Sequence, residues 1–266
     1  MSEPLAVESV RAALVRARER AEAHMVGAHE IGLPWGEKTV TELVLVAAHP
    51  EIQCADFSDK DERDTGADWL WWWVDDAAEA FGMLVQAKRL KGRHPSWVID
   101  FWYRDGKQSN TLETTAELLR VPDIYVLYLG GVAAREGWSC GPAHGQDCGR
   151  CQRASVSYVP GLIVRDLGRS SGSRSELADA AMHVAEPLEE LIQPAGEQRP
   201  VHDMNLPQLD VELASFLLRG QAGRTRSGQV SSPADRNTTD PKSLPTGRRH
   251  IGTTRARRGI SSGAAR

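Results

Sequence analysis

The sequence predicts a soluble α/β protein in which a mixed β-sheet is flanked by helices. Stretches of helical periodicity alternate along the 266 residues with short segments rich in aromatic and β-branched residues. Residues 124–129 form a continuous apolar run, which is typical of a strand covered on both faces. No uncharged apolar run is long enough to span a bilayer, so we expect no membrane role.

Composition sets limits on the compartment and the partners. Hydrophobic residues make up 41% of the chain, and the N-terminus has no apolar signal core, so we expect a cytoplasmic protein. Residues 220–266 carry ten Lys/Arg and two Asp/Glu, a net charge of +8, which leaves 22 basic and 34 acidic residues elsewhere, a net charge of -12. An acidic body gives no general attraction for DNA, whereas a basic tail adds non-specific affinity for nucleic acid.

Two helices are expected before the first strand. Residues 3–25 carry an apolar stripe at helical spacing, and a second helix follows the break at 32–36 and runs to Ala48. Thr39 and Glu42 have the spacing of a capping box for this second helix.

The strands and later helices follow from the same patterns. Residues 69–73 contain four tryptophans, so both faces of that strand carry indoles and we expect helices to cover both. The other expected elements are a strand at 52–57, a charged hairpin connection at 58–64, an irregular strand at 97–103, a helix at 108–120 ended by Pro122, a strand pair at 156–167 broken at 160–161, a helix at 175–192 and a short closing helix at 203–218.

Two polar side chains share one face of an otherwise apolar strand. Gln86 and Lys88 alternate with Val85 and Ala87, and a period of two directs the amide and the ammonium to the same side. A buried lysine needs a partner, and Asp68 on the preceding strand is the nearest candidate. An acid, an amide and an amine placed together are suited to holding a divalent metal against a phosphate.

The residues Asp68, Gln86 and Lys88 match the motif of a known superfamily. With the segments TGADW, QAKRL and PDIYVLYLG, they resemble the Mrr-like branch of the PD-(D/E)xK nucleases and a family of uncharacterised bacterial proteins assigned to the same fold. The resemblance covers roughly residues 35–129. It implies a restriction endonuclease-like core and Mg²⁺- or Mn²⁺-dependent cleavage of DNA, in defence against foreign DNA, and it leaves a homodimer open.

The resemblance also implies a role for each residue of the site. Asp68, an upstream glutamate and the backbone carbonyl of Ala87 would hold the metal, and Lys88 would neutralise the charge that develops on the phosphate or orient the attacking water. Gln86 would coordinate the metal weakly or orient other groups. It stands where the superfamily usually has a glutamate, which removes one negative charge from the site, and Gln is the known variant of the Mrr-like branch.

Three glutamates are candidates for the upstream ligand. Glu37 borders the apolar stripe of the second helix and is the first choice. Glu42 has a sufficient role in the capping box and is the second choice, and Glu62 in the charged connection is the third.

Basic residues follow the motif directly. Arg89, Lys91 and Arg93 form the densest basic cluster of the body, where a nucleic-acid strand would have to be held; a solvated surface explains them equally well. Gln108, at the start of the next helix, is explained by a helix-start hydrogen bond or by a match to the relatives.

A second group of residues predicts a structural zinc site. Cys140, His144, Cys148 and Cys151 have the spacing C-x3-H-x3-C-x2-C within a loop that has little apolar residue to pack it. Four soft ligands suit tetrahedral zinc and leave no open position for water. Cys54 stands alone in a strand and is expected to be a small core residue.

The expected organisation has five parts: an N-terminal helix at 1–30, a nuclease-like core at 31–135, a zinc-binding loop at 136–155, further strands and closing helices at 156–218, and a disordered basic tail at 219–266. Two other functions remain open. One is a nuclease fold without catalysis that binds nucleic acid or protein, and the other is a structural protein in which Asp68 and Lys88 form a buried ion pair.

Overall fold

The computed structural model describes residues 7–74, 80–102, 106–140 and 148–192, which all belong to the compact unit Met1–Ser227. The predictions for His144, for a closing helix at 203–218 and for a disordered tail lie outside the described residues.

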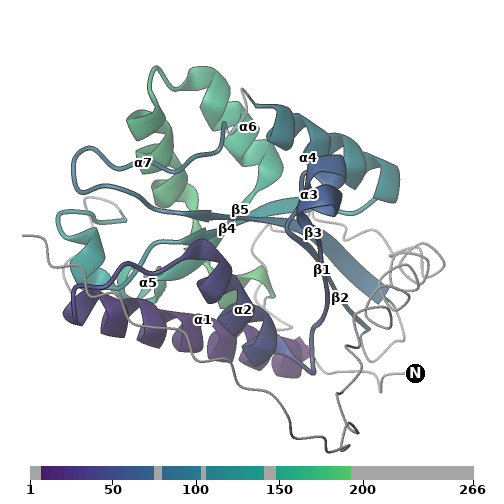
Figure 1. The fold of residues 1–266 in the computed structure, drawn as a ribbon, viewed down its shortest axis with the longest axis horizontal. Coiled ribbons are helices and arrows are strands. Elements are labelled where there is room, and N and C mark those ends of the chain that lie inside the picture. Colours follow the sequence, from purple (N-terminus) through teal and green to yellow (C-terminus); the bar gives the residue numbers. More distant parts are fainter. Residues whose placement is uncertain (1–6, 75–79, 103–105, 141–147, 193–266) are drawn as a thin grey trace, which may run out of the picture. The chain divides into compact units, whose positions relative to one another are not determined.

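A six-stranded mixed sheet forms the middle layer of the fold, and helices cover both of its faces (Figure 1). The strand order is β1-β2-β3-β4-β5-β6; β3 and β4 are parallel and all other neighbours are antiparallel. The strands are β1 (Gln53–Asp56), β2 (Trp69–Val74), β3 (Ala80–Arg89), β4 (Asp123–Tyr128), β5 (Val156–Pro160) and β6 (Glu186–Pro187). The predicted class of a mixed sheet flanked by helices is therefore confirmed.

The helices divide between the two faces of the sheet. One face packs against α1 (Val7–Glu30) and α2 (Glu37–Ala48), and the opposite face packs against α4 (Lys107–Leu119), α6 (Gly161–Ser170) and α7 (Arg174–Val184). The short helices are α3 (Asp59–Thr65), α5 (Gly149–Arg153), η1 (Val132–Arg135) and η2 (Leu188–Leu191). Among the residues that the structure describes, no helix combines the length and the apolar composition needed to cross a bilayer.

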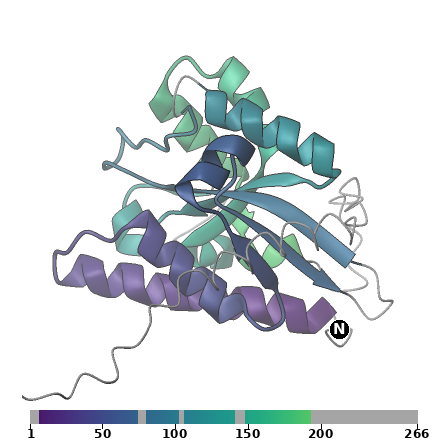
Figure 2. The same cartoon turned by 45° about the vertical axis from the view of Figure 1, so that its right-hand side comes forward.

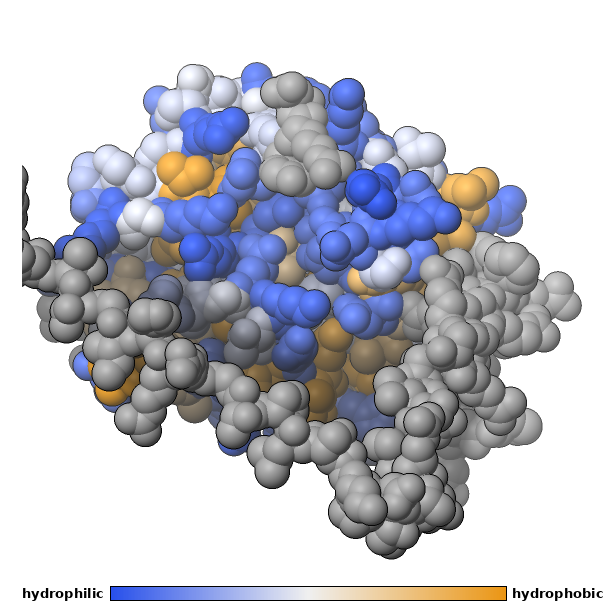
Figure 3. Space-filling model, in the orientation of Figure 1, coloured by the Kyte–Doolittle hydropathy of each residue, from blue (hydrophilic) through white to orange (hydrophobic). Residues whose placement is uncertain are grey.

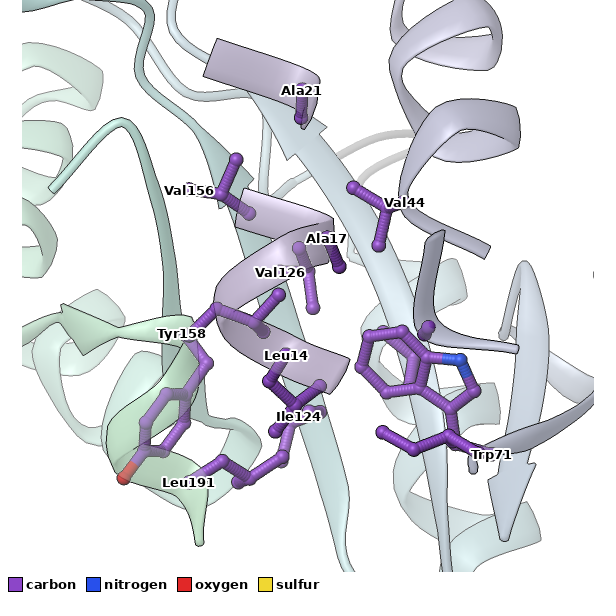
Figure 4. Close-up of a cluster of buried hydrophobic side chains, with 14 of the residues drawn as sticks. Leu14, Ala17, Ala21, Val44, Trp71, Ile124, Val126, Val156, Tyr158 and Leu191 are labelled. Atoms are coloured by element: carbon purple, nitrogen blue, oxygen red, sulfur yellow. The ribbon is translucent and has the colours of Figure 1, made fainter. Parts of the chain in front are cut away.

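Two cores result from this layering. The predicted stripe of α1 is buried against the strands, and Figure 4 shows Leu14, Ala17 and Ala21 of this helix in one cluster with Val126, Val156 and Trp71 of the sheet. The tryptophans of β2 alternate as expected: Trp69, Trp71 and Trp73 lie in this first core, while Leu70 and Trp72 lie toward the second. Helices thus cover both faces of the tryptophan-rich strand, as predicted.

The charged connection at 58–64 joins the antiparallel strands β1 and β2, as the predicted hairpin requires, but the prediction missed that it forms a helix, α3. Ser58 caps the helix: its hydroxyl accepts a hydrogen bond from the amide of Asp61, and the Asp61 carboxylate accepts one from the amide of Ser58. No residue of α3 is buried. Apolar periodicity therefore could not reveal this helix, and the capping box is its only sequence signal.

The capping box predicted for Thr39 and Glu42 is also wrong. Helix α2 begins at Glu37 with Gly36 as its N-cap, which places Thr39 inside the first turn, and no side chain caps this helix. Glu42 therefore caps nothing, and it is exposed on the side of α2 away from the buried stripe.

Three later elements differ from the sequence predictions. The second strand expected at 156–167 is the helix α6, in which Gly161, Val164 and Arg165 form the buried face. The helix expected at 175–192 ends at Val184, because Pro187 cannot continue it and instead pairs with Ser157 as the edge strand β6. The strand expected at 97–103 reduces to one bridge between Val98 and Lys91.

Candidate functional site

Strand β3 extends past the end of β2 and leaves one edge of the sheet open. The β2 ladder ends where Trp69 faces Val85, whereas residues 86–89 continue beside β4 alone. The last backbone bond across this pair runs from the amide of Asp68 to the carbonyl of Val85, at 2.8 Å. Alternate residues of such a strand direct both backbone groups to the same side, so Ala87 and Arg89 present theirs to the open edge. Figure 2 shows the sheet from a direction in which α3 lies in front of it.

Two carboxylates accept backbone hydrogen bonds at this open edge. Asp68 Oδ2 accepts a hydrogen bond of 2.6 Å from the amide of Ala87 and one of 2.7 Å from Nε2 of Gln86. Glu37, the first residue of α2, accepts a backbone hydrogen bond from Arg89. Asp68 and Glu37 thus approach the same strand edge from separate elements. Such a position is needed if both are ligands of one metal, as the sequence analysis predicted.

Burial raises the pKa of both acids. Desolvation raises the pKa of Asp68 to about 7, against the opposing effects of the Ala87 amide and the Lys88 ammonium. Desolvation also raises the pKa of Glu37, which Lys88 opposes. The folded protein disfavours ionisation of Asp68, so this group stabilises the fold fully at a pH below 3.8, its pKa in the unfolded chain. That contribution is lost as the pH rises toward the folded pKa of about 7. A bound cation would reverse this effect by favouring the carboxylate.

The TGADW segment places Asp68 at this position. Helix α3 ends at Gly66, whose φ of 74° is left-handed. Gly66 lies so close to α4 that a Cβ atom there would collide with the backbone of Gln108 and Leu112. The Thr65 hydroxyl bonds the carbonyl of Asp61 and the amide of Ala67, which fixes the turn into β2.

Replacing Gly66 by alanine is expected to destabilise the fold by about 3 kcal/mol or more, because a left-handed penalty of about 1 kcal/mol is added to a backbone collision. Gly32 is the matched control, since its φ of 70° is similar but a Cβ atom added there would meet nothing within 4 Å. Gly32→Ala should therefore lose only about 1 kcal/mol. Chemical denaturation of both variants measures the difference, and equal losses would contradict the close approach of α3 to α4.

Gln86 and Lys88 lie on the face of β3 that α4 covers, as the period of two predicted. Gln86 is 1% exposed and Lys88 is 8% exposed. Lys88 Nζ donates a 3.1 Å hydrogen bond to Oε1 of Gln108 and forms no salt bridge with a carboxylate of the described residues. The interpretation of Asp68 and Lys88 as a buried ion pair is not supported by this geometry.

Gln108 connects the lysine to an acid. Its Nε2 donates a 2.8 Å hydrogen bond to Glu62 of α3, while its Oε1 accepts from Lys88. The amide therefore orients the ammonium through a side-chain bridge between α3, α4 and β3. Glu62 is engaged in this bridge, which is a different role from the metal ligand considered for it.

These residues line one cavity of about 560 Å³ at the open edge. Sequence reasoning missed three of its carboxylates, Asp56, Asp59 and Asp100. The first two flank the turn from β1 to α3, where the end of a strand could have drawn attention to them; Asp100 carried no sequence signal. Figure 3 shows hydrophilic side chains gathered across the middle of the face on which α2 and α3 lie. The cavity is lined by Glu37, Lys38, Thr41, Glu42, Leu45, Val46, Asp56, Phe57, Asp59, Glu62, Asp68, Gln86, Ala87, Lys88, Arg89, Lys91, Asp100 and Gln108.

The open edge presents carboxylate and carbonyl oxygens that could coordinate a hydrated divalent cation. Within the described residues, the only group of three acidic, histidine or cysteine ligand atoms close enough to share an ion is formed by cysteines elsewhere, so the cavity offers no set of three carboxylates. Mg²⁺ needs only one or two carboxylates, because it keeps several waters. Gln86 Oε1 is buried and has no hydrogen-bond partner among the described residues, which leaves one acceptor unsatisfied beside Asp68.

The basic cluster divides between structural and accessible positions. Arg89 donates a 2.6 Å hydrogen bond to the carbonyl of Trp35, and its guanidinium lies 5.7 Å from the centre of that indole. Lys91 is exposed and lines the cavity, whereas Arg93 is exposed and lies outside the cavity lining. Of the three residues predicted to hold nucleic acid, Lys91 is thus the best placed.

Three of the four predicted zinc ligands converge at helix α5, of which Cys148 is the N-cap. The sulfur atoms of Cys140, Cys148 and Cys151 all lie within 4.8 Å of one another, and no disulfide joins them. This group could hold a metal ion. Cys54 packs against the first core and takes no part in it.

The fold and these two sites define a mixed α/β protein with a polar cavity at an open sheet edge and a separate cluster of three thiols. A family model described as "Family of unknown function (DUF6615)" matches residues 9–254. The match spans most of the 266 residues, so the chain belongs to this family. A comparison with curated proteins found no match.

Proposed function

We propose that this protein is a metal-dependent nuclease with a restriction endonuclease-like core, which hydrolyses phosphodiester bonds of DNA with Mg²⁺ or Mn²⁺. The observation that carries the proposal is the meeting of Asp68, Gln86 and Lys88 on one side of the open edge of β3, with Glu37 reaching the same edge. The resemblance to Mrr-like enzymes supports it, and a role in defence against foreign DNA belongs to the proposal.

Asp68, Glu37 and the Ala87 carbonyl would hold the cation. When bound, the cation supplies a water molecule of lowered pKa and a positive charge beside the phosphate. Gln86 is neutral, so it adds no charge and orients Asp68 through the hydrogen bond from Nε2. The site therefore has one negative charge fewer than a site with a glutamate at this position.

Lys88 would stabilise the negative charge that develops on the phosphate during hydrolysis. Its ammonium has three donors and uses one of them on Gln108, which leaves two for phosphate oxygens. Burial of its side chain increases the strength of this interaction, because the surrounding dielectric is lower than in water. Lys38 and Lys91 lie on the rim of the cavity and would contact phosphates of the strand.

A titration with Mg²⁺ tests the proposal. Mg²⁺ at 100 times its dissociation constant should stabilise the wild-type protein by about 2.7 kcal/mol, and Asp68→Asn should lose this gain. The apparent affinity should rise from pH 6 to pH 8, because the metal competes with a proton on a group whose pKa is about 7. Thermal unfolding over a series of Mg²⁺ concentrations measures both effects.

The matched control is Glu42→Gln, which removes an exposed carboxylate of the same cavity and should keep the Mg²⁺ effect. Plasmid and single-stranded DNA are then incubated with each protein in Mg²⁺ or Mn²⁺. Binding of DNA without cleavage, together with no stabilisation by Mg²⁺, would replace the proposal by a nuclease fold that binds nucleic acid without catalysis.

A further inference from the structure

The three cysteines are spaced for a metal ion and not for a disulfide. Cys140 Sγ and Cys148 Sγ are 3.5 Å apart, and all three sulfurs lie within 4.8 Å of one another. Tetrahedral zinc with Zn–S bonds of about 2.3 Å requires sulfurs about 3.8 Å apart, whereas a disulfide requires about 2.05 Å. The backbone amide of Cys140 also donates a 3.2 Å hydrogen bond to Cys151 Sγ, which fixes the position of that sulfur beside Cys140.

A buried arginine lies against this cluster. Arg135 is 3% exposed, and its Nη1 donates a 2.8 Å hydrogen bond to the carbonyl of Cys151. Its Nε donates to the carbonyl of Gly130, and its guanidinium lies 5.6 Å from the ring centre of Trp138. Arg135 therefore connects the end of β4 to the helix α5, which carries Cys151.

The charge of Arg135 is not balanced by a carboxylate in contact with it. Within the described ranges, Arg135 forms no salt bridge, and its buried Nη2 has no hydrogen-bond partner. The other two buried arginines, Arg18 and Arg165, both pair with carboxylates. Burial lowers the pKa of Arg135, and the charges of Glu22 and Cys151 oppose this effect. A buried charge is costly unless it is balanced, and a thiolate centre at Cys151 would add the balancing charge that no contacting carboxylate supplies.

We propose that Cys140, Cys148 and Cys151 bind one zinc ion as thiolates, and that Arg135 is the counter-charge of this anionic centre. Three thiolates and one Zn²⁺ carry a net charge of −1 when any further ligand is neutral, which matches the single charge of the guanidinium. Binding converts three thiols into three thiolates and releases three protons to the solvent. The centre performs no catalysis and does not depend on the proposed nuclease activity.

The position of α5 gives the metal a structural role. Arg150 of this helix donates hydrogen bonds to the carbonyls of His183 and Ala185 at the end of α7. Arg153 donates to Glu189 and Glu190 of η2. A metal that fixes α5 would therefore also fix the last described elements of the chain against the sheet.

Metal analysis and a zinc competition titration on the full chain test the proposal. The purified protein should contain one zinc per chain, and Co²⁺ exchanged into it should give the intense near-ultraviolet absorption of thiolate ligands, which Cys151→Ala should remove. Arg135→Met should weaken zinc binding by about 10- to 100-fold, the usual effect of losing a partner of a metal ligand. Arg165→Met is the matched control, because it removes a buried arginine of α6 that pairs with Asp123 and Glu113, and it should leave zinc affinity within about twofold.

A second pair of variants separates charge from packing if Arg135→Met fails to fold. Arg135→Lys keeps the charge and Arg135→Gln removes it. The Arg135→Lys protein should therefore bind zinc at least about tenfold more tightly than the Arg135→Gln protein. Hydrogen exchange should increase in α5, η2 and the end of α7 after zinc is removed, and not in β1 to β3. A zinc-free protein without cobalt bands would overturn the metal site. Equal zinc affinities for the Lys and Gln variants would overturn the role of Arg135.

Discussion

Replacing Lys88 by alanine is expected to reduce the rate of Mg²⁺-dependent DNA cleavage by about 100- to 1,000-fold, the effect of removing one preorganised group that stabilises a developing charge. Lys88 is the only lysine among the buried residues of the described part of the chain, and Gln108 holds its ammonium in place. The loss should appear in kcat, since the interaction strengthens as charge develops on the phosphate. Single-turnover cleavage of a labelled oligonucleotide measures it.

Two variants separate catalysis from folding in this experiment. Lys91→Ala removes an exposed lysine of the same cavity and should raise KM with little change in kcat. Lys88→Met keeps the length of the side chain and removes a buried charge that has no contacting carboxylate among the described residues, so stability should be retained or increased. Cleavage by Lys88→Ala at the wild-type rate would rule out this lysine and, with it, the proposed mechanism.

The change Glu189→Gln is expected to lower the free energy of unfolding by about 3 kcal/mol, because it leaves a buried guanidinium partly uncompensated. Glu189 is 1% exposed, and both of its carboxylate oxygens accept from Nε of Arg18, at 3.1 and 2.9 Å. Arg153 adds a third hydrogen bond of 3.1 Å. Glu22 still contacts Arg18 at 3.2 Å in this variant, which keeps the loss at the lower end of the range for broken buried ion pairs.

Glu19→Gln is the matched control for this prediction. Glu19 contacts the same arginine at 3.4 Å, but its side chain is 62% exposed, so the loss should stay below about 0.5 kcal/mol. A loss of about 3 kcal/mol corresponds to a fall in melting temperature of roughly 6–12 °C for a protein of this size. Equal effects of the two substitutions would show that burial of Glu189 contributes nothing to the ion pair.

Periodicity predicted the parts of the fold that pack on a core. The stripe of α1 and the alternation of β3 are encoded by residues two, three or four positions apart, and burial is the property that such spacing reports. The meeting of Asp68 with Gln86 was predicted from the same alternation, because Gln86 faces one side of β3 and Asp68 directly precedes the neighbouring strand β2. The thiol cluster was also predictable, because its ligands lie within 12 residues of one another.

The parts that periodicity missed depend on contacts between distant residues. Helix α3 buries none of its side chains, so it left no apolar stripe to detect. The bridge from Lys88 through Gln108 to Glu62 joins three elements, and the bond from the Arg89 amide to Glu37 depends on where β2 stops. Neither follows from local patterns, because the register of the sheet and the packing of α3 on α4 decide them.

The two acids at the open edge of β3 also have a role in the fold that is independent of any chemistry. Ala87 is only 1% exposed, and a buried amide without a hydrogen-bond partner costs about 1–3 kcal/mol. Asp68 and Glu37 accept hydrogen bonds from the strand where β2 no longer pairs with it. Stability of the fold alone would therefore favour keeping both side chains.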